Sequence, residues 1–247
     1  MSGHSKWLTI KRQKGAADAA RGQIFTKLSN AITIAVKQSG GISDPESNFK
    51  LRLAIDRARS ANMPKENIER AIARAGIAAA GQMDEVLYEG FAPGGVALII
   101  EAVTDNKNRT ISEIKNILEK GGGSLGTPGA VSYQFAQKGL ITINKNNMSL
   151  DDIFNLAVGA GVEDIEEAGS QVLFYTDSQQ LKRVKDAVLE QGLSVTDAEL
   201  IKKPVTTLLV DHRETADKVL SLIEKIEALD DVQKVYSNLE IPDNFIS

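Results

Sequence analysis

Residues 139–203 read GLITINKNNMSLDDIFNLAVGAGVEDIEEAGSQVLFYTDSQQLKRVKDAVLEQGLSVTDAELIKK, and this stretch decides the fold. Short apolar runs and apolar residues with helical spacing follow one another, which predicts the order β-α-β-β-α-β. The strands are expected near Leu140–Asn144, Val162–Glu166, Val172–Thr176 and Val195–Ile201. The helices are expected after the N-cap Ser149 and over Leu181, Val184, Val188 and Leu189. This order is a split β-α-β unit that can close its own core. If residues 139–203 expressed alone were unfolded, the expectation would be wrong.

The sequence on either side makes a second α+β unit only when both flanks are combined. Residues 82–138 have strand candidates at Val86–Phe91, Val96–Val103 and Val131–Phe135, and one helix at Ile111–Lys120, opened by the capping pair Thr110 and Glu113 and closed by Gly121. Residues 204–240 add a strand near Val205–Val210, a helix carrying Val219, Leu222, Ile223 and Ile226, and a strand at Val232–Tyr236. We therefore expect the unit 139–203 to be inserted into a domain formed by 82–138 and 204–247.

The first 81 residues predict a basic arm followed by a helical domain. Ile24, Phe25, Leu28, Ile32, Ala35 and Val36 share one helical face, and Gly40-Gly41 ends that helix. Asp44-Pro45 is expected to open a helix that runs to about Asn62 and buries two faces, with basic residues in the seams between them. A further helix is expected over Pro64–Ala75, and Ile77–Gly81 is the candidate linker. The predicted fold class is thus α+β: an N-terminal helical bundle (1–81) followed by two ferredoxin-like-type α+β domains, one inserted in the other.

Charge divides the chain more sharply than any motif does. Residues 1–75 hold 14 Lys/Arg against 6 Asp/Glu, a net of +8. Subtraction from the chain totals of 29 and 33 leaves 15 against 27, so residues 76–247 carry −12. A basic end on an acidic body is typical of a protein that grips a polyanion with one end only. With no Cys, no secretory signal and no apolar run of membrane-spanning length, the sequence predicts a cytoplasmic protein without membrane contact.

The parts for catalysis are missing from the sequence. Gly121–Gly126 matches G-x-G-x-x-G but follows a helix and precedes a strand, so we interpret it as a connector. Two His in different domains cannot form a zinc site, and the acidic groups Glu163-Asp164, Glu166-Glu167 and Asp230-Asp231 are interpreted as solvated surface. We predict no catalytic residues, no cofactor and no metal, and hence no enzyme.

The arm and the helical seams supply the candidate binding residues. The arm combines closely spaced cations with the only Trp, and phosphates can take the charges while bases stack on the ring. The alternative for Trp7 is an anchor folded back on the bundle. The predicted nucleic-acid-binding residues are His4, Lys6, Trp7, Lys11, Arg12, Lys14, Arg21, Lys27, Lys50, Arg52, Arg57, Arg59 and Lys65.

The chain resembles the YebC/PmpR family over almost its whole length. The matching residues are Gly3-His4-Ser5-Lys6-Trp7, Arg21-Gly22, Ile24–Leu28, Leu51–Ile55, Asn62-Met63-Pro64, Asn67–Ile72, Tyr88-Glu89-Gly90, Pro93–Val96, Thr104-Asp105-Asn106 and Asn108-Arg109-Thr110. The resemblance implies three domains and a regulatory role without catalysis, in a family of transcriptional regulators that includes mitochondrial translational activators. This chain departs from the family pattern at Gln13, where a basic residue is common, and in its Ala-rich linker.

Two nucleic-acid hypotheses and one rival follow. The leading hypothesis is a DNA-binding transcriptional regulator that contacts promoter DNA through residues 4–75. The alternative is a translation factor on the ribosome that contacts ribosomal RNA and acts on elongation; a flexible arm with phosphate contacts suits structured RNA slightly better, because no recognition helix is evident. The rival is a small-ligand or protein-binding module in which Thr104–Thr110, at a helix N-terminus, holds an anion.

Overall fold

The computed structural model describes residues 18–75, 83–146, 148–242 and 245, without the side chains of residues 18–21. The chain separates into two compact units, one containing Ala136–Val205 and the other containing Ala16–Phe135 with Thr206–Ser247. Each unit is α+β, as predicted, and the described residues between 18 and 75 are mainly helical. The proposed division into domains 1–81, 82–138 with 204–247, and 139–203 stays a prediction.

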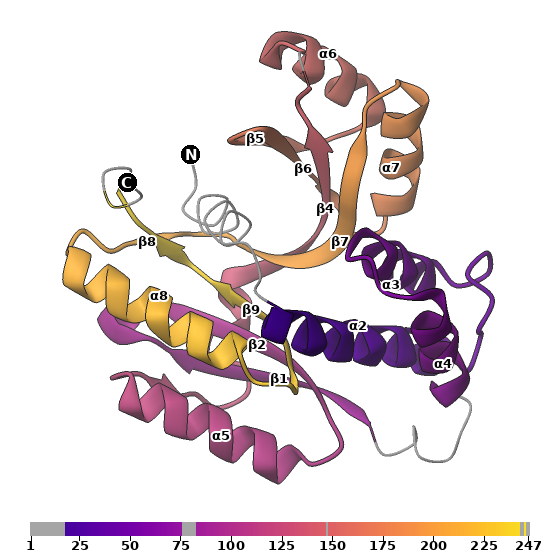
Figure 1. Ribbon diagram of the computed structural model, residues 1–247. Coiled ribbons are helices and arrows are strands. Elements are labelled where there is room, and N and C mark those ends of the chain that lie inside the picture. The colour runs from indigo at the N-terminus through magenta and orange to yellow at the C-terminus, as the bar shows by residue number, and fades with distance from the viewer. Residues whose placement is uncertain (1–17, 76–82, 147, 243–244, 246–247) are drawn as a thin grey trace. The chain divides into compact units, whose positions relative to one another are not determined.

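Three helices form the N-terminal region of the larger unit (Figure 1): α2 (Asp18–Gln38), α3 (Phe49–Ser60) and α4 (Lys65–Ala75). Their apolar faces meet in one core that includes the fully buried residues Ile32, Leu51 and Ala58. In addition, Thr33 joins two of the helices, because its buried hydroxyl donates to the carbonyl oxygens of Ser29 (2.9 Å) and Ala71 (3.1 Å). The hydroxyl therefore fixes α2 against α4.

Helix α3 begins later than the sequence predicted. The expected N-cap, Asp44, instead holds a turn by accepting from the Glu46 backbone N–H and the Ser47 hydroxyl. The true N-cap is Asn48, whose side-chain oxygen accepts from the Leu51 N–H at 3.1 Å. Its amide nitrogen donates to three oxygens of the preceding segment, which are Ala35 O, Ser39 Oγ and Ile42 O. Tertiary hydrogen bonds thus decide which of two good capping residues opens the helix.

The larger unit contains a four-stranded sheet in the order β3-β1-β2-β9. Its strands are β1 (Asp84–Phe91), β2 (Ala97–Thr104), β3 (Ser124–Leu125) and β9 (Val232–Ser237). Strand β2 pairs antiparallel with β1 through Tyr88↔Ile100 and with β9 through Leu98↔Ser237. Because successive residues point to opposite faces and Leu98, Ile99 and Ile100 are all fully buried, both faces of β2 are covered.

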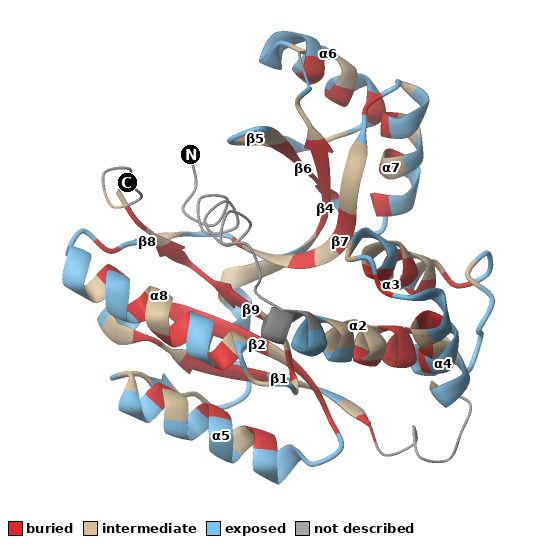
Figure 2. Cartoon of the chain, viewed as in Figure 1, coloured by how far each residue is buried: buried red, intermediate tan, exposed pale blue. Residues whose placement is uncertain are grey.

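Two helices pack against this sheet and against each other: α5 (Lys107–Lys120) and α8 (Arg213–Glu227). Figure 2 shows their exposed sides turned away from the strands. The strand expected at Val205–Val210 is shorter in the structure, where only β8 (Leu208–Leu209) forms. It pairs in parallel with β10 (Leu239–Glu240). The turn between β1 and β2 is the short 3-10 helix η2 (Pro93–Gly95), in which Gly94 has a positive φ of 77°.

Two further expectations for the larger unit were wrong. The capping pair Thr110 and Glu113 does not open α5; Asn106 does, since its side chain accepts from the Arg109 N–H, and Thr110 is buried inside the first turns. The strand expected at Val131–Phe135 is the 3-10 helix η3 (Ser132–Gln134). The Val131 and Ser132 N–H groups, where η3 begins, donate to the buried Glu89 carboxylate and not to a neighbouring strand, which local sequence could not indicate.

The smaller unit has the predicted order β-α-β-β-α-β. Its elements are β4 (Phe135–Asn144), α6 (Leu150–Ala160), β5 (Asp164–Ala168), β6 (Gln171–Asp177), α7 (Leu181–Glu190) and β7 (Val195–Pro204). The sheet order β5-β6-β4-β7 is that of a ferredoxin-like unit. Ser149 caps α6 as predicted, accepting from the Asp152 N–H at 3.1 Å. The inner strands β4 and β6 carry the core, including the buried Ile141 and Phe174.

Candidate nucleic-acid interface

Part of the predicted interface lies outside the described residues. This applies to His4, Lys6, Trp7, Lys11, Arg12 and Lys14, and to the side chain of Arg21 at the start of α2. Their contact with nucleic acid stays a prediction. The other predicted cations are placed by the three helices and differ in how much of their charge is available.

Two predicted cations support the fold of the larger unit. The Arg52 guanidinium donates to Pro45 O (3.1 Å) and Glu46 O (3.0 Å), and it pairs with the Glu46 carboxylate at 2.9 Å. It therefore fastens the turn before α3. The Lys27 ammonium donates to the carbonyl oxygen of Glu227, the last residue of α8. A cation at a helix C-terminus interacts favourably with the helix dipole.

Three predicted cations are exposed on the helical region. Lys50 donates to the neutral side-chain oxygen of Gln38 at 2.7 Å, Arg59 is exposed at the end of α3, and Lys65 lies 3.5 Å from Glu69. Exposed i,i+4 pairs of this kind contribute only about 0.3–0.5 kcal/mol, so Lys65 can exchange its partner for a phosphate at little cost. Arg57, by contrast, is half-buried.

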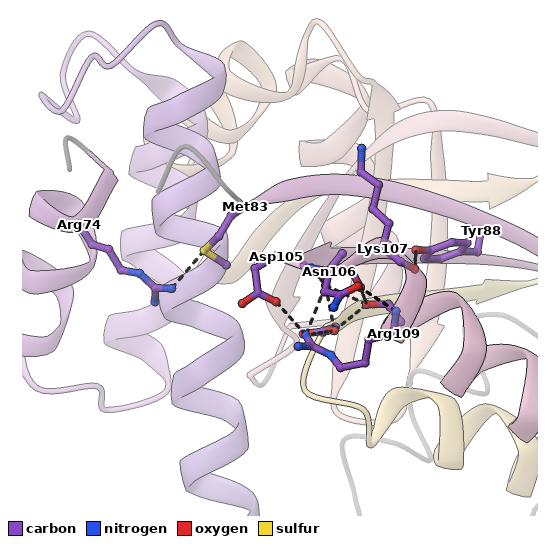
Figure 3. A network of polar contacts seen from close by, with 10 residues as sticks. Arg74, Met83, Tyr88, Asp105, Asn106, Lys107 and Arg109 are labelled. Carbon is purple, nitrogen blue, oxygen red and sulfur yellow. Dashed lines mark hydrogen bonds and ion pairs between the residues drawn. The ribbon is translucent and has the colours of Figure 1, made fainter. Parts of the chain in front are cut away.

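A groove between α2 and α4 adds cations that the sequence analysis missed. Its volume is ≈ 250 Å³, and its lining residues are Phe25, Thr26, Ser29, Asn30, Met63, Asn67, Arg70, Ala71 and Arg74. Asn67, Arg70 and Arg74 follow one another at i, i+3 and i+7, and this spacing was the available signal for one polar helix edge. Arg74 donates to the Met83 sulfur at 3.3 Å (Figure 3), whereas Arg70 has no bonding partner within the described ranges.

A second polar cluster joins the end of β2, the start of α5 and the segment before β9. The Asp231 carboxylate accepts from the Thr110 hydroxyl (2.6 Å), the Arg109 guanidinium (2.7 Å) and the Thr104 hydroxyl (3.0 Å). Burial alone would raise the pKa of Asp231, but these hydrogen bonds outweigh it and hold the pKa below its usual value. Figure 3 shows Arg109 also turned toward Asp105, 3.0 Å away.

This cluster bears on the rival hypothesis of an anion site at Thr104–Thr110. Asp231 is itself the anion that the Arg109 guanidinium and the Thr110 hydroxyl hold, and Asn106 caps the helix. The hydrogen-bonding groups of the Thr104–Thr110 segment are thus bonded to other groups of the protein. The geometry favours a structural role in joining α5 to the sheet.

A third cluster fixes the segment 126–134 to β1. The Glu89 carboxylate is 5 % exposed and accepts the backbone N–H groups of Gly129 (2.8 Å), Val131 (2.6 Å) and Ser132 (2.9 Å). Burial alone would raise the pKa of Glu89, yet the three N–H bonds prevail and lower it. The Tyr88-Glu89-Gly90 motif therefore has a structural explanation in this fold.

The acidic groups Glu163-Asp164 and Glu166-Glu167 of the smaller unit are paired with lysines. Glu163 lies 2.7 Å from Lys138, Glu167 lies 2.6 Å from Lys145, and Lys203 bridges Asp164 at 2.6 Å and Glu166 at 3.6 Å. Within the described part of the chain, no group of three or more His, Cys, Asp or Glu side chains is placed to hold a metal ion. A further groove, between α5 and α8, has mixed charge, with Lys120 and Lys225 beside Glu214 and Asp217.

Fold and surface together define an α+β protein whose N-terminal helices carry an excess of positive charge. Residues 5–77 match the family model described as the TACO1/YebC protein N-terminal domain, and residues 83–239 match the model of the TACO1/YebC second and third domain. The chain belongs to the TACO1/YebC family, which confirms the resemblance noted in the sequence. Among the described helices, none is long and apolar enough to cross a membrane.

Relatives cover nearly the full length. A "Probable transcriptional regulatory protein" of Roseiflexus castenholzii is 52 % identical over 98 % of this chain and 96 % of its own. Another with that name, of Dictyoglomus thermophilum, is 49 % identical over 100 % of this chain and 98 % of its own. The crystal structure of a conserved hypothetical protein from Aquifex aeolicus, 42 % identical, superposes with a TM-score of 0.86 over 92 % of this chain and 93 % of that one.

Proposed function

We propose that the protein is a non-enzymatic regulator of gene expression that binds nucleic acid through residues 4–75. The observation that supports this most is the division of charge, +8 on residues 1–75 against −12 on the remainder. On the described helices, Lys50, Arg59 and Arg70 are exposed and form no ion pair with any described carboxylate. Such cations are available to phosphates, while like charge keeps the acidic body away from the same polyanion.

Two shielded carboxylates, one buried and one partly exposed, support a role without catalysis. Glu89 and Asp231 are the two carboxylates whose surroundings most resemble those of an active-site acid, since both are shielded and both have a displaced pKa. Each already accepts three hydrogen bonds from the protein, and the pKa of each is lowered, which is the wrong direction for a general base near neutral pH. Their chemistry is that of fixed structural anions.

The relatives' names favour transcription, and hence promoter DNA, as the target. The second candidate, a translation factor bound to ribosomal RNA, is favoured by one observation. The described helices carry a concave polar groove between α2 and α4, whereas a duplex major groove is read by an element that enters it. A concave site suits unpaired nucleotides, which are typical of RNA loops. A cytoplasmic location, where both polymers occur in bacteria, belongs to the same proposal.

The test compares charge reversals in the full chain. Lys50→Glu with Arg59→Glu is matched by Lys115→Glu with Lys182→Glu, an equal change of charge at exposed positions on α5 and α7. Mobility-shift titration on promoter fragments and co-sedimentation with ribosomes are run in parallel. We expect the first pair to weaken binding at least tenfold and to flatten its salt dependence, because phosphate contacts are lost. If the wild-type chain binds neither polymer, or if both pairs behave alike, the proposed function is wrong.

A further inference from the structure

The groove between α2 and α4 is lined by an amide that bonds to no described protein group. Asn30 lines the groove and is only 7 % exposed. Its side chain makes no hydrogen bond to any residue that the structure describes. The side-chain atoms of Asn30 are not among the fully buried polar atoms that lack a partner, so the amide is open to the groove that it lines. A ligand that enters the groove can therefore bond to this amide.

The groove offers several further groups around Asn30. Asn67 lies on the α4 side of the groove, and its side-chain amide also has no described partner. Arg70, one turn further along α4, is an exposed cation on the same edge. Phe25 supplies an aromatic wall from α2. The hydroxyl of Thr33 fixes the two helices to each other beneath these groups, so the groove is preformed.

Each of these groups matches one part of a nucleotide. Side-chain amides carry both donors and an acceptor, which is the complement of a base's hydrogen-bonding edge. An aromatic ring contacts the face of any base, and a guanidinium binds phosphate through parallel N–H donors. The volume of ≈ 250 Å³ is below the roughly 300–1,000 Å³ of pockets for drug-sized ligands. The groove therefore has room for one small group, such as a single base.

We propose that the α2–α4 groove binds one unpaired nucleotide of a single-stranded nucleic acid, with the base against Phe25, Asn30 and Asn67 and its phosphate on Arg70. This inference rests on the proposed function and names the kind of target. A base within a duplex is excluded, because its pairing edge is already occupied and its faces are stacked. A free phosphate would use Arg70 alone and would leave the amides and the ring without a role.

The test measures the affinity of the full chain for three labelled probes by fluorescence anisotropy. The probes are a single-stranded RNA of mixed sequence and about 12 nucleotides, the DNA strand of the same sequence, and the DNA duplex formed from it. The RNA and DNA strands distinguish the two sources of an unpaired nucleotide. The variants are Phe25→Leu, Asn30→Ala and Asn67→Ala. The matched control is Asn116→Ala, at an exposed position on α5.

We expect Phe25→Leu to weaken single-strand binding by up to about 5- to 150-fold, the range for lost base stacking. Asn30→Ala and Asn67→Ala should each weaken it about 2- to 13-fold, the range for one lost hydrogen bond. Duplex binding and the Asn116→Ala control should stay within about twofold of wild type. Asn30→Ala should melt no lower than wild type, because it removes an amide that has no partner; a structural amide would lower the melting temperature.

Failure of the inference and failure of the proposed function give different results. If the wild type binds none of the three probes, nucleic-acid binding itself is refuted. If the wild type binds but Phe25→Leu and Asn67→Ala bind the single strands equally well, the nucleotide site is refuted and the proposed function stands. Equal weakening of duplex and single-strand binding would also overturn the preference for an unpaired nucleotide.

Discussion

Replacing Glu89 by Gln should destabilise the larger unit strongly, although the two side chains have the same shape. In the wild type, one carboxylate oxygen accepts from Gly129 N–H, and the other accepts from Val131 and Ser132 N–H. Glutamine has one oxygen, which can serve two of these donors, so its NH₂ group must face the third. One charge-assisted bond is lost, worth about 1.5–3 kcal/mol, and the remaining two lose roughly half their strength. We expect the free energy of unfolding to fall by about 3–6 kcal/mol in total.

Thermal unfolding followed by circular dichroism gives the first measurement. At about 2–4 °C per kcal/mol for a chain of this size, the melting temperature should fall by roughly 6–24 °C. Hydrogen exchange over residues 126–134 locates the cause, since the amides of Gly129, Val131 and Ser132 should lose protection. The control Glu119→Gln, at an exposed position of α5, should change neither measurement. An unchanged melting temperature with protected amides in Glu89→Gln would refute the reasoning.

The same carboxylate predicts a pH dependence with a definite sign. The folded-state pKa of Glu89 is lowered, so its contribution is fully present above the unfolded-state pKa of about 4.3. It is lost as the pH falls through the lower, folded-state pKa. The difference in stability between wild type and Glu89→Gln should therefore be constant near neutrality and shrink in acid. A difference that grows below pH 4 would contradict this assignment.

Three further predictions concern other residues. Asp231→Asn should lower the free energy of unfolding in urea by about 1.5–3 kcal/mol at neutral pH, and by less in acid because the pKa of Asp231 is also lowered. The control Asp230→Asn, at an exposed position, should leave the free energy of unfolding unchanged. Gly123→Ala should lower the free energy of unfolding by about 1–3 kcal/mol, and with it the melting temperature, because a Cβ there would lie 2.4 Å from a backbone carbonyl oxygen. The control Gly22→Ala, whose Cβ would have nothing within 4 Å, should raise the melting temperature slightly. Arg70→Ala should reduce the salt slope of single-strand binding by about 0.7, and an unchanged slope would remove Arg70 from the phosphate contacts.

Local sequence pattern was sufficient to predict an element wherever its apolar face determines whether it is a helix or a strand. The order β-α-β-β-α-β in the smaller unit and the helix over residues 65–75 follow from apolar spacing, and both were predicted. Helix starts depended on distant partners. Asp44 and Asn48 are equally good caps in isolation, and only the bonds from Asn48 to the end of α2 select it. Thr110 was misplaced for the same reason, since its hydroxyl is directed to Asp231, 121 residues away.

The candidate site was predictable in kind and only partly in detail. Charge counting identified the helical region, because net charge needs no coordinates. It could not show that Arg52 fastens a turn, or that Arg70 and Asn67 face α2 across a groove. An exposed cation and one already bonded to a carbonyl look alike in sequence. The partnerless amide of Asn30 is a property of packing between two helices, and no local signal marks it.

The pairing of β9 with β2 has a consequence for synthesis of the chain. Residue 98 leaves the ribosomal tunnel long before its pairing partner, residue 237, and the whole compact unit Ala136–Val205 is made in between. During that interval β2 has no neighbour on one side, and an uncovered strand edge is a template for association with other nascent chains. Early folding of the intervening unit would bring the two attachment points together and shorten the loop that β9 must close. We therefore expect mutations that delay folding of that unit to cause aggregation through β2, which belongs to the other unit.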